Sequence, residues 1–197
     1  MRALRNLTLL LALIAPAAFA DNQYVVEMIL VRQNAVPAIT SQFAPENWSD
    51  GAKAVEPYDV RQPILTGEAE RLAADSQYTV LLHRAWQQTV GAEGSKIALS
   101  DGQEQFGHFP IEGNLSLSEG RFLSVEASLW VNQFDANGGV IQSEQFRQGN
   151  SNVKNAELTY LDGGHLALIL KIRKAGTPAT AAPDPATAKP APPPPPP

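Results

Sequence analysis

The chain has 197 residues, of which 44% are hydrophobic and 18% charged, and it contains no cysteine. Disulfides, thiolate metal sites and thiol nucleophiles are therefore excluded, and the fold depends on its apolar core alone. The formal net charge of −5 argues against nucleic acid as a partner, and against loose attachment to anionic lipid, because both depend on excess Lys and Arg.

The first twenty residues have the three regions of a secretory signal peptide. Arg2 and Arg5 form a basic head, residues 7–15 are apolar, and Ala18-Phe19-Ala20 is typical of a cleavage site. The apolar run is shorter than the roughly 20 residues that a membrane span needs. We therefore expect residues 1–20 to be removed, leaving a periplasmic protein with no stable membrane anchor. Cleavage removes two of the 15 basic residues and none of the 20 acidic ones, which gives a mature charge of −7.

The C-terminal residues 175–197 consist mainly of Ala, Pro and Thr and end in Pro192–Pro197. Such a segment cannot bury enough apolar surface to offset its ordering entropy, so we expect a disordered tail with polyproline II character. It is either a solvated tail, or a spacer or ligand for an aromatic groove. Residues 21–174 are then expected to form a single domain, a length that buries an adequate core.

The first elements of this domain are a strand and a helix. Residues 24–32 are apolar on both parities, which predicts a central strand buried on both faces. Residues 34–59 contain three prolines and no sustained period, so we expect irregular structure. Residues 66–75 predict a short helix with Thr66 as its N-cap. The inner face of that helix would be formed by Leu65, Ala69 and Leu72.

Residues 78–89 fit either a strand or a continuation of the helix, and their Tyr, Thr, Val and Trp content favours the strand. Strict alternation would place one set of side chains on a single face: Tyr78, Val80, Leu82, Arg84 and Trp86.

The second half of the domain predicts a series of antiparallel strands. Residues 109–117 form the first, followed by a turn at 118–120. The clearest alternation in the chain then places Leu123, Val125, Ala127, Leu129 and Val131 on one face, opposite Phe122, Ser124, Glu126, Ser128 and Trp130.

A turn at residues 135–139 leads to a return strand at 140–147, and residues 149–152 are expected to break the chain. Asp162-Gly163-Gly164 predicts a hairpin between residues 156–161 and 165–173. The inward face of the last strand would be Leu166, Leu168, Leu170 and Ile172. The predicted fold class is α+β, a mostly antiparallel sheet with a helix packed on one face.

No catalytic or metal-binding motif is present. The three histidines lie far apart, and nucleophile elbows and phosphate loops are absent. We therefore expect no catalytic residues, no metal and no cofactor. Paired carboxylates could still hydrolyse a glycan, and that alternative stays open for Glu112, Glu126, Glu144, Glu157 and Asp162.

Aromatic and basic side chains on strand faces suggest a different chemistry. Arg84 and Trp86 share a parity, as do Phe122 and Trp130, and Tyr160 precedes the hairpin turn. Aromatic rings stack on sugars and Arg pairs with carboxylates, the two chemical features of a peptidoglycan strand with its stem peptide. The alternative is that both tryptophans belong to the core and that Asp162 caps its own turn.

Four segments in order resemble the CsiV family of periplasmic peptidoglycan-binding proteins: YVVEMILVRQ at 24–33, YTVLLHRAWQQ at 78–88, RFLSVEASLWV at 121–131 and ELTYLDGGHLALILKI at 157–172. The resemblance implies peptidoglycan binding, an outer-membrane lipoprotein activator of a cell-wall synthase as a partner, and no enzymatic activity. The residues carried over as ligand-binding candidates are Arg84, Trp86, Arg121, Trp130, Glu157, Tyr160 and Asp162.

The chain departs from the family pattern near its hairpin. The pattern Glu-Leu-His-Tyr-x-Asp-His-Pro is replaced by residues 157–164, in which Thr159 and Gly163 stand at the histidine positions. Ser151 and Asn152 replace a basic pair, and Lys154 remains. These differences imply weaker binding or another ligand if those positions contact it in the family.

The sequence as a whole predicts a non-enzymatic periplasmic accessory protein that binds peptidoglycan, a cell-wall synthesis partner, or both. Two alternatives remain: an adaptor that accepts a partner strand at a sheet edge without binding glycan, and a carboxylate-dependent glycan hydrolase.

Overall fold

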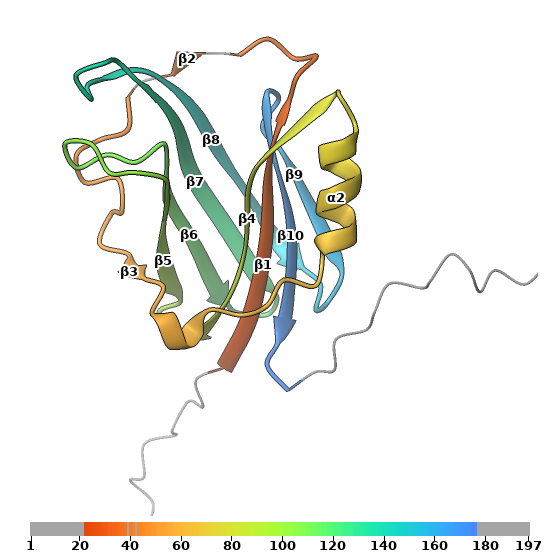
Figure 1. Ribbon diagram of the computed structural model, residues 1–197. Coiled ribbons are helices and arrows are strands. Elements are labelled where there is room, and N and C mark those ends of the chain that lie inside the picture. The colour runs from red at the N-terminus through yellow and green to blue at the C-terminus, as the bar shows by residue number, and fades with distance from the viewer. Residues whose placement is uncertain (1–21, 39, 42, 177–197) are drawn as a thin grey trace, which may run out of the picture.

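The computed structural model describes residues 22–38, 40, 41 and 43–176. The predicted signal peptide and nearly all of the predicted tail lie outside the described residues. The described chain forms two β-sheets that face each other, with one α-helix on the outside (Figure 1). Its elements are β1 (Asn22–Gln33), β2 (Thr40–Ser41), β3 (Lys53–Ala54), η2 (Pro57–Asp59), α2 (Thr66–Ala74), β4 (Tyr78–Val90), β5 (Ser95–Asp101), β6 (Ile111–Glu119), β7 (Leu123–Phe134), β8 (Val140–Val153), β9 (Leu158–Asp162) and β10 (Leu166–Lys174).

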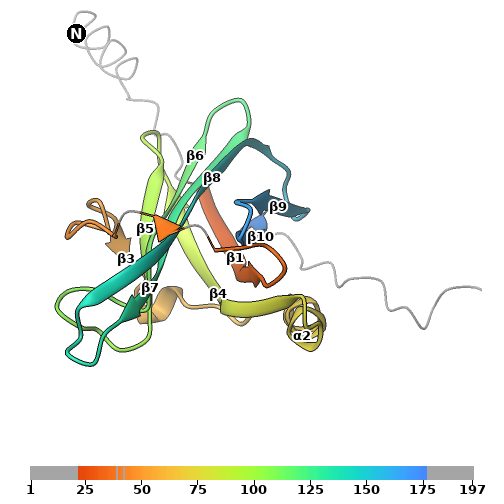
Figure 2. The ribbon, with the colours of Figure 1, turned by 90° about the horizontal axis from the view of Figure 1, so that it is seen from above.

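The strands divide into a four-stranded sheet, β4-β1-β10-β9, and a six-stranded sheet, β2-β8-β7-β6-β5-β3. Neighbouring strands are antiparallel except β3 and β5, which are parallel. Seen from above, the sheets form two layers, with α2 outside β4 (Figure 2). The mostly antiparallel β prediction is confirmed, but the strands form two sheets rather than one. A sheet that is apolar on one face must cover it, and here a second sheet does so.

The core lies between the two sheets. The alternation predicted for β7 is confirmed, because its apolar set from Leu123 to Val131 belongs to this core. The predicted inward set of β10, from Leu166 to Ile172, belongs to it as well. On β1 the contributors are Tyr24, Val26, Met28 and Leu30. Periodicity in the sequence therefore identified the buried face of β7 and of β10.

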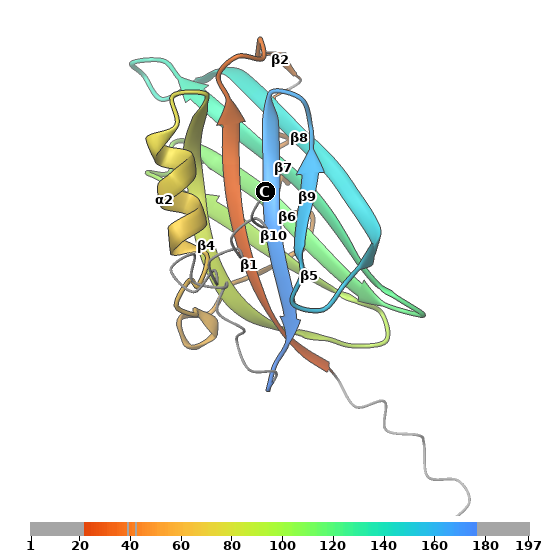
Figure 3. The same cartoon turned by 90° about the vertical axis from the view of Figure 1, so that its right-hand side faces the viewer.

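The central strand β1 is also buried on its outer face, as its continuous apolar pattern predicts. Ile29 and Val31 form a second small cluster with Leu65 and Ala167, against which Ala69 and Leu72 of α2 pack. Figure 3 shows α2 lying along the β4 side of the four-stranded sheet. The helix bounds agree with the prediction. The predicted cap is wrong: Leu65 is the N-cap residue, and no side chain caps the helix.

A buried carboxylate on β1 binds the backbone just before the helix. Glu27, only 3% exposed, accepts hydrogen bonds from the backbone N–H groups of Ile64 at 3.0 Å and Leu65 at 2.7 Å. Its Oε1 also lies 2.8 Å from Nε2 of His83 on β4. Glu27 thereby fixes the two residues that precede the helix to the outer face of the sheet.

Three local predictions need correction. A register shift between Leu30 and Val31 of β1 displaces the pairing with β4, so that Tyr78 and Val80 face outward while Leu82 and Trp86 face the core. The strict alternation predicted for residues 78–89 is therefore wrong, because a bulge reverses the parity. The segment 149–152 does not break the chain but lies within β8. The strand β5 was not predicted from the sequence.

Polar contacts join the two sheets at both ends of β1. At one end, Arg32 donates two hydrogen bonds to Glu144 of β8, at 2.8 and 3.2 Å, and Nε2 of His165 lies 2.9 Å from the same carboxylate. At the other end, the Asn22 amide donates to Glu119 of β6 at 2.7 Å, and Tyr24 hydrogen-bonds to the same side chain. These contacts fix how the sheets lie against each other.

Candidate functional site

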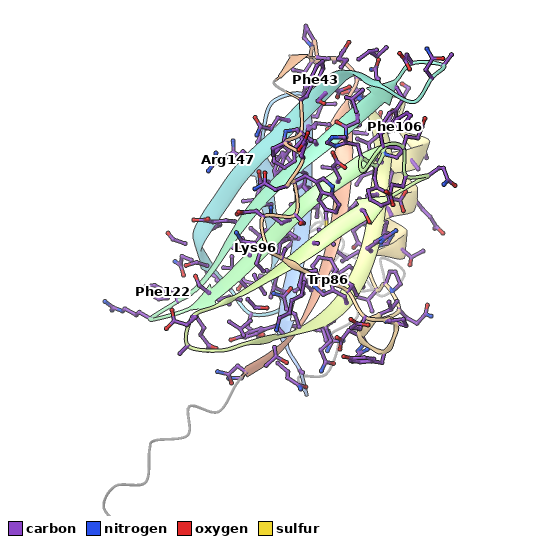
Figure 4. All side chains as sticks on the ribbon, turned by 90° about the vertical axis from the view of Figure 1, so that its left-hand side faces the viewer. Phe43, Trp86, Lys96, Phe106, Phe122 and Arg147 are labelled. Carbon is purple, nitrogen blue, oxygen red and sulfur yellow. The ribbon has the colours of Figure 1, made fainter. Side chains whose placement is uncertain are left out.

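An open groove of about 600 Å³ lies on the outer face of the six-stranded sheet. Figure 4 views this face and shows Lys96 and Arg147 on it. We call it the outer groove and define it by its lining residues from β5 to β8 and from the loop before β3: Pro45, Asn47, Trp48, Asp50, Lys96, Asn114, Ser116, Glu126, Ala127, Ser128, Trp130, Gln145, Arg147, Gln148 and Gly149.

The floor of the outer groove comes from the polar face of β7 and its neighbours. Ser128 and Trp130 lie on the face opposite the core set, as the alternation predicts. In the sheet register, Asn114 of β6 pairs with Ser128, and Gln145 of β8 pairs with Trp130. The register therefore places amides, a hydroxyl and an indole side by side. Trp130 is 7% exposed, so it contributes a small apolar area to a largely polar floor.

A wall of the outer groove is formed by the loop that contains Trp48. The Trp48 indole N–H donates to the Gly107 carbonyl at 3.0 Å, and the ring meets Phe109 edge-on at 5.8 Å between centroids. The Trp48 carbonyl accepts a hydrogen bond from the Asn114 amide at 3.2 Å. These contacts anchor the loop to the β5–β6 connection and to β6, so this side of the groove is held in place.

The charges along the outer groove are partly paired. Asp50 forms a salt bridge with Lys96 at 2.5 Å, and this hydrogen bond and charge hold the pKa of the Asp50 carboxyl below its usual value. The exposed Arg147 and Glu126 form no ion pair with another described residue. The site thus offers a guanidinium for an anionic group, and amides and hydroxyls for ligand hydroxyls.

The structure separates the seven predicted site residues. Trp130 lies in the outer groove. Arg84 and Trp86 both line a smaller pocket of about 330 Å³ beside β4, although Trp86 is only 1% exposed and belongs mainly to the core. Arg121 lies in the turn between β6 and β7, with its guanidinium 5.3 Å from the ring centroid of Phe122.

The other three predicted residues lie around the β9–β10 hairpin. Glu157 is exposed and 3.5 Å from the Lys154 amine. Tyr160 is 54% exposed, and its pKa is raised by partial burial and by the nearby Asp162. Asp162 accepts a hydrogen bond from the Gly164 N–H at 2.9 Å, so it has the turn-capping role that was the alternative reading. These residues do not meet the outer groove.

Several residues of the outer groove were missed by sequence reasoning. Gln145 and Arg147 lie on a predicted strand and alternate with the buried Glu144 and Phe146, so parity could have indicated them. Trp48 lies in an irregular proline-containing segment, and nothing in the local sequence indicates that it packs over the sheet.

The carboxylates considered for hydrolysis do not gather in one place. Glu112 is fully buried, with its Oε1 2.7 Å from His108 Nδ1, and also accepts hydrogen bonds from the Phe109 N–H and the Asn132 amide. Glu144 is buried in its contact with Arg32 and His165. Only Glu126 among the five candidates lines the outer groove.

Neither a cluster of metal ligands nor a membrane-spanning helix is found among the described residues. No group of three or more potential metal ligands lies together in the part of the chain that the structure describes. Within the same residues, no helix is long and apolar enough to cross a membrane.

The described residues form two facing sheets with an open polar groove on one outer face. The chain belongs to the CsiV family, because the model of that family, described as peptidoglycan-binding protein CsiV, matches residues 52–175. This match confirms the resemblance predicted from the sequence. Searches of curated proteins and of solved structures found no significant match.

The departures from the family pattern lie away from the outer groove. Thr159 is buried in β9, and a Cβ at Gly163 would lie 2.7 Å from a ring carbon of Phe146 and 2.9 Å from the Leu166 carbonyl oxygen. A larger residue at position 163 would displace a core phenylalanine. Neither Thr159 nor Gly163 lines the outer groove.

Proposed function

We propose that this protein binds peptidoglycan through the outer groove. The observation that carries the proposal is the meeting, in a domain of a peptidoglycan-binding family, of an indole, several amides and the guanidinium of Arg147 in one open groove. Trp130 would add a small apolar contact beneath a sugar ring, and Asn114 and Gln145 would hydrogen-bond to sugar hydroxyls. Arg147 would pair with a stem-peptide carboxylate.

The proposal is one of binding without bond cleavage. Hydrolysis by paired carboxylates needs one acid whose pKa is raised so that it donates a proton. The acids that line the outer groove are Asp50 and Glu126, and the Lys96 ammonium lowers the pKa of Asp50. Asp50 is thus poorly suited to be that acid, which supports an accessory protein over a hydrolase.

The cellular setting follows from the family and the predicted signal peptide. We place the mature protein in the periplasm, where it would bind the wall and assist an outer-membrane lipoprotein activator of a peptidoglycan synthase. The family match supports this setting, and the lipoprotein partner is an expectation from the resemblance.

A pull-down with purified sacculi tests the groove. Arg147→Glu reverses the charge that would meet the stem-peptide carboxylate, so we expect at least a tenfold loss of the bound fraction at low salt. Arg71→Glu makes the same change of charge on the exposed face of α2 and should bind like the original protein. Equal binding by both variants, or no binding by the original protein, would contradict the proposal.

Zymography on cell-wall substrate tests the absence of catalysis. The mature protein should leave no cleared band. A band that appears with the original protein and disappears with Glu126→Gln would show that the groove hydrolyses the glycan.

A protein adaptor is the second candidate, and one observation favours it. The edge strand β9 exposes Leu158 and Tyr160, with exposed fractions of 55% and 54%. Such an edge can accept a strand from a partner. Crosslinking in cells, followed by digestion of the wall, separates the candidates: an adaptor retains one dominant protein partner, whereas a glycan binder is released.

A further inference from the structure

Four charged side chains line the outer groove, and only two of them are paired with each other. The four are Asp50, Lys96, Glu126 and Arg147. Asp50 and Lys96 form the salt bridge described above. Glu126 and Arg147 are both exposed, and among the described residues neither takes part in an ion pair or a side-chain hydrogen bond. One groove therefore offers a ligand both an anion and a cation.

The sheet register places these two charges near each other on the open face. Glu126 of β7 pairs with Gly149 of β8, and Ser128, two residues further along β7, pairs with Arg147. Glu126 and Arg147 are therefore diagonal neighbours on adjacent strands, with Cα atoms about 7–8 Å apart. Both side chains lie on the outer face, because the residue before each of them in its strand belongs to the core. Figure 4 shows Arg147 on this face.

Gly149 provides the space in which the Glu126 side chain lies. A Cβ at position 149 would be 3.3 Å from Cγ of Glu126 and 3.0 Å from the Val125 carbonyl oxygen. Gly149 is not among the glycines with a positive φ, so its backbone conformation does not require glycine. The missing side chain matters for space: it allows Glu126 to lie against β8, the strand that carries Arg147.

Two opposite charges that do not bond each other suit a ligand that carries both signs. A simple anion would be attracted by Arg147 and repelled by Glu126, and a simple cation would meet the reverse. A group with an ammonium and a carboxylate on one carbon gains a charge-assisted hydrogen bond from each side chain. Hydroxyls lie beside both charges, because Ser116 pairs with Glu126 and Ser128 pairs with Arg147. They can donate to the carboxylate or accept from the ammonium.

From these observations we infer that the outer groove binds the zwitterionic end of a wall peptide that is not crosslinked. Glu126 takes the ammonium and Arg147 takes the carboxylate. Free amino acids have this pair of groups, and so does the side-chain end of diaminopimelate in a stem peptide. A crosslink converts that ammonium into a neutral amide and removes the partner of Glu126. The inference deepens the proposed function and rests on it, because it assigns the group that the groove recognises.

Titration of the mature protein with a disaccharide tripeptide that ends in diaminopimelate, followed by amide chemical shifts in NMR, tests the inference. Two matched probes each lack one charge. Acetylation of the single free amine removes the ammonium, and lysine in place of diaminopimelate removes the adjacent carboxylate. We expect each probe to bind about fivefold more weakly, the upper range for an exposed ion pair. Free alanine is the fourth probe, and alanine binding as tightly as the muropeptide would overturn the assignment to wall peptide.

Three isosteric or near-isosteric variants assign each charge to its side chain. Glu126→Gln should abolish the preference for the free over the acetylated amine and leave the affinity for the acetylated probe unchanged. Arg147→Gln should abolish the preference for diaminopimelate over lysine. Glu70→Gln removes the same charge from the exposed face of α2 and should retain both preferences.

Equal affinity for the free and acetylated muropeptides would overturn the inference, and so would a preference that persists in Glu126→Gln. The absence of any shift at about 10 mM, where even a millimolar site is occupied, would do the same. Sacculus binding measured in parallel separates the inference from the proposed function. If sacculi bind in a manner that depends on Arg147 while the probes are not distinguished, the inference alone fails.

Discussion

The outer faces of the two sheets are used in opposite ways. On the four-stranded sheet the outward residues of β1 include Glu27, Ile29 and Val31, and a helix with its preceding loop covers them. On the six-stranded sheet the outward residues of β7 include Glu126 and Ser128, and they line an open groove. The same strand geometry thus gives a covered face on one sheet and an open groove on the other, depending on what packs against it. Substitutions on the two faces should therefore differ in their effect on stability.

Removal of an apolar side chain should separate the faces most clearly. Ile29→Ala empties a fully buried position beneath α2, and we expect a loss of about 3–4 kcal/mol in the free energy of unfolding. Ser128→Ala on the outer groove should change it by less than about 0.5 kcal/mol. Urea denaturation measures both. A similar cost for the two variants would show that the groove face is also part of the stabilising core.

The two outward glutamates provide an isosteric comparison. Glu27→Gln replaces an oxygen that accepts backbone N–H groups by an NH2 group, so we expect a loss of about 1–3 kcal/mol. Glu126→Gln should cost less than about 0.5 kcal/mol because the side chain is exposed. Thermal unfolding of both proteins checks this, and a greater loss in Glu126→Gln would contradict it.

The contact that Tyr24 makes between the sheets should make the free energy of unfolding depend on pH in the alkaline range. Burial, together with the hydrogen bond to Glu119 and its charge, raises the pKa of Tyr24 to about 12 from an ordinary value of 10. The unfolded chain loses this proton near pH 10 while the folded chain retains it, so stability is complete below pH 10 and falls as the pH rises to about 12.

Tyr24→Phe should therefore reduce the loss of stability over this alkaline range by about 1–2 kcal/mol. Denaturation at pH 9 and at pH 11.5 measures the difference. Tyr58→Phe, at a side chain that is 76% exposed, is the control and should follow the original protein.

The smallest effect on stability is expected at acidic pH, from the pair of Asp50 and Lys96 that lines the outer groove. Lys96 lowers the pKa of Asp50 from its ordinary value of 3.8, so the stability from this pair is present above that pH and is lost as the pH falls through the lower folded value. Asp50→Asn should slightly flatten the decline of the unfolding temperature below pH 4. An unchanged profile would mean that the exposed pair adds nothing to stability.

Much of the fold follows from local patterns, and the exceptions have physical causes. The alternation in β7 and β10 identified the core faces because one side of each strand must be apolar when a single layer covers it. The β4 faces were wrong because one extra residue in the pairing reverses the parity, and a bulge leaves no clear mark in composition. β5 was missed because Ser95–Asp101 is short and contains few large apolar residues.

The site was less predictable than the fold. The sequence identified Trp130 and the polar face around it, but it grouped that residue with Tyr160 and Asp162, which lie on another sheet. Parity assigns a residue to one of two faces, but it cannot state which strands are neighbours. The smaller pocket beside β4, which both residues line, shows the same limit, because Arg84 was a candidate while Arg61 lies in a segment without periodicity.

The sequence by itself determined the family, the strand-rich composition, the apolar faces and the helix at residues 66–74, because these depend on residues close together in the chain. Only the tertiary structure decided which outer face stays open. That outcome depends on contacts between distant residues, such as Trp48 with Gly107 and Glu27 with Leu65. Loops carry no periodic signal, so where they cross a sheet becomes visible only when the chain has folded.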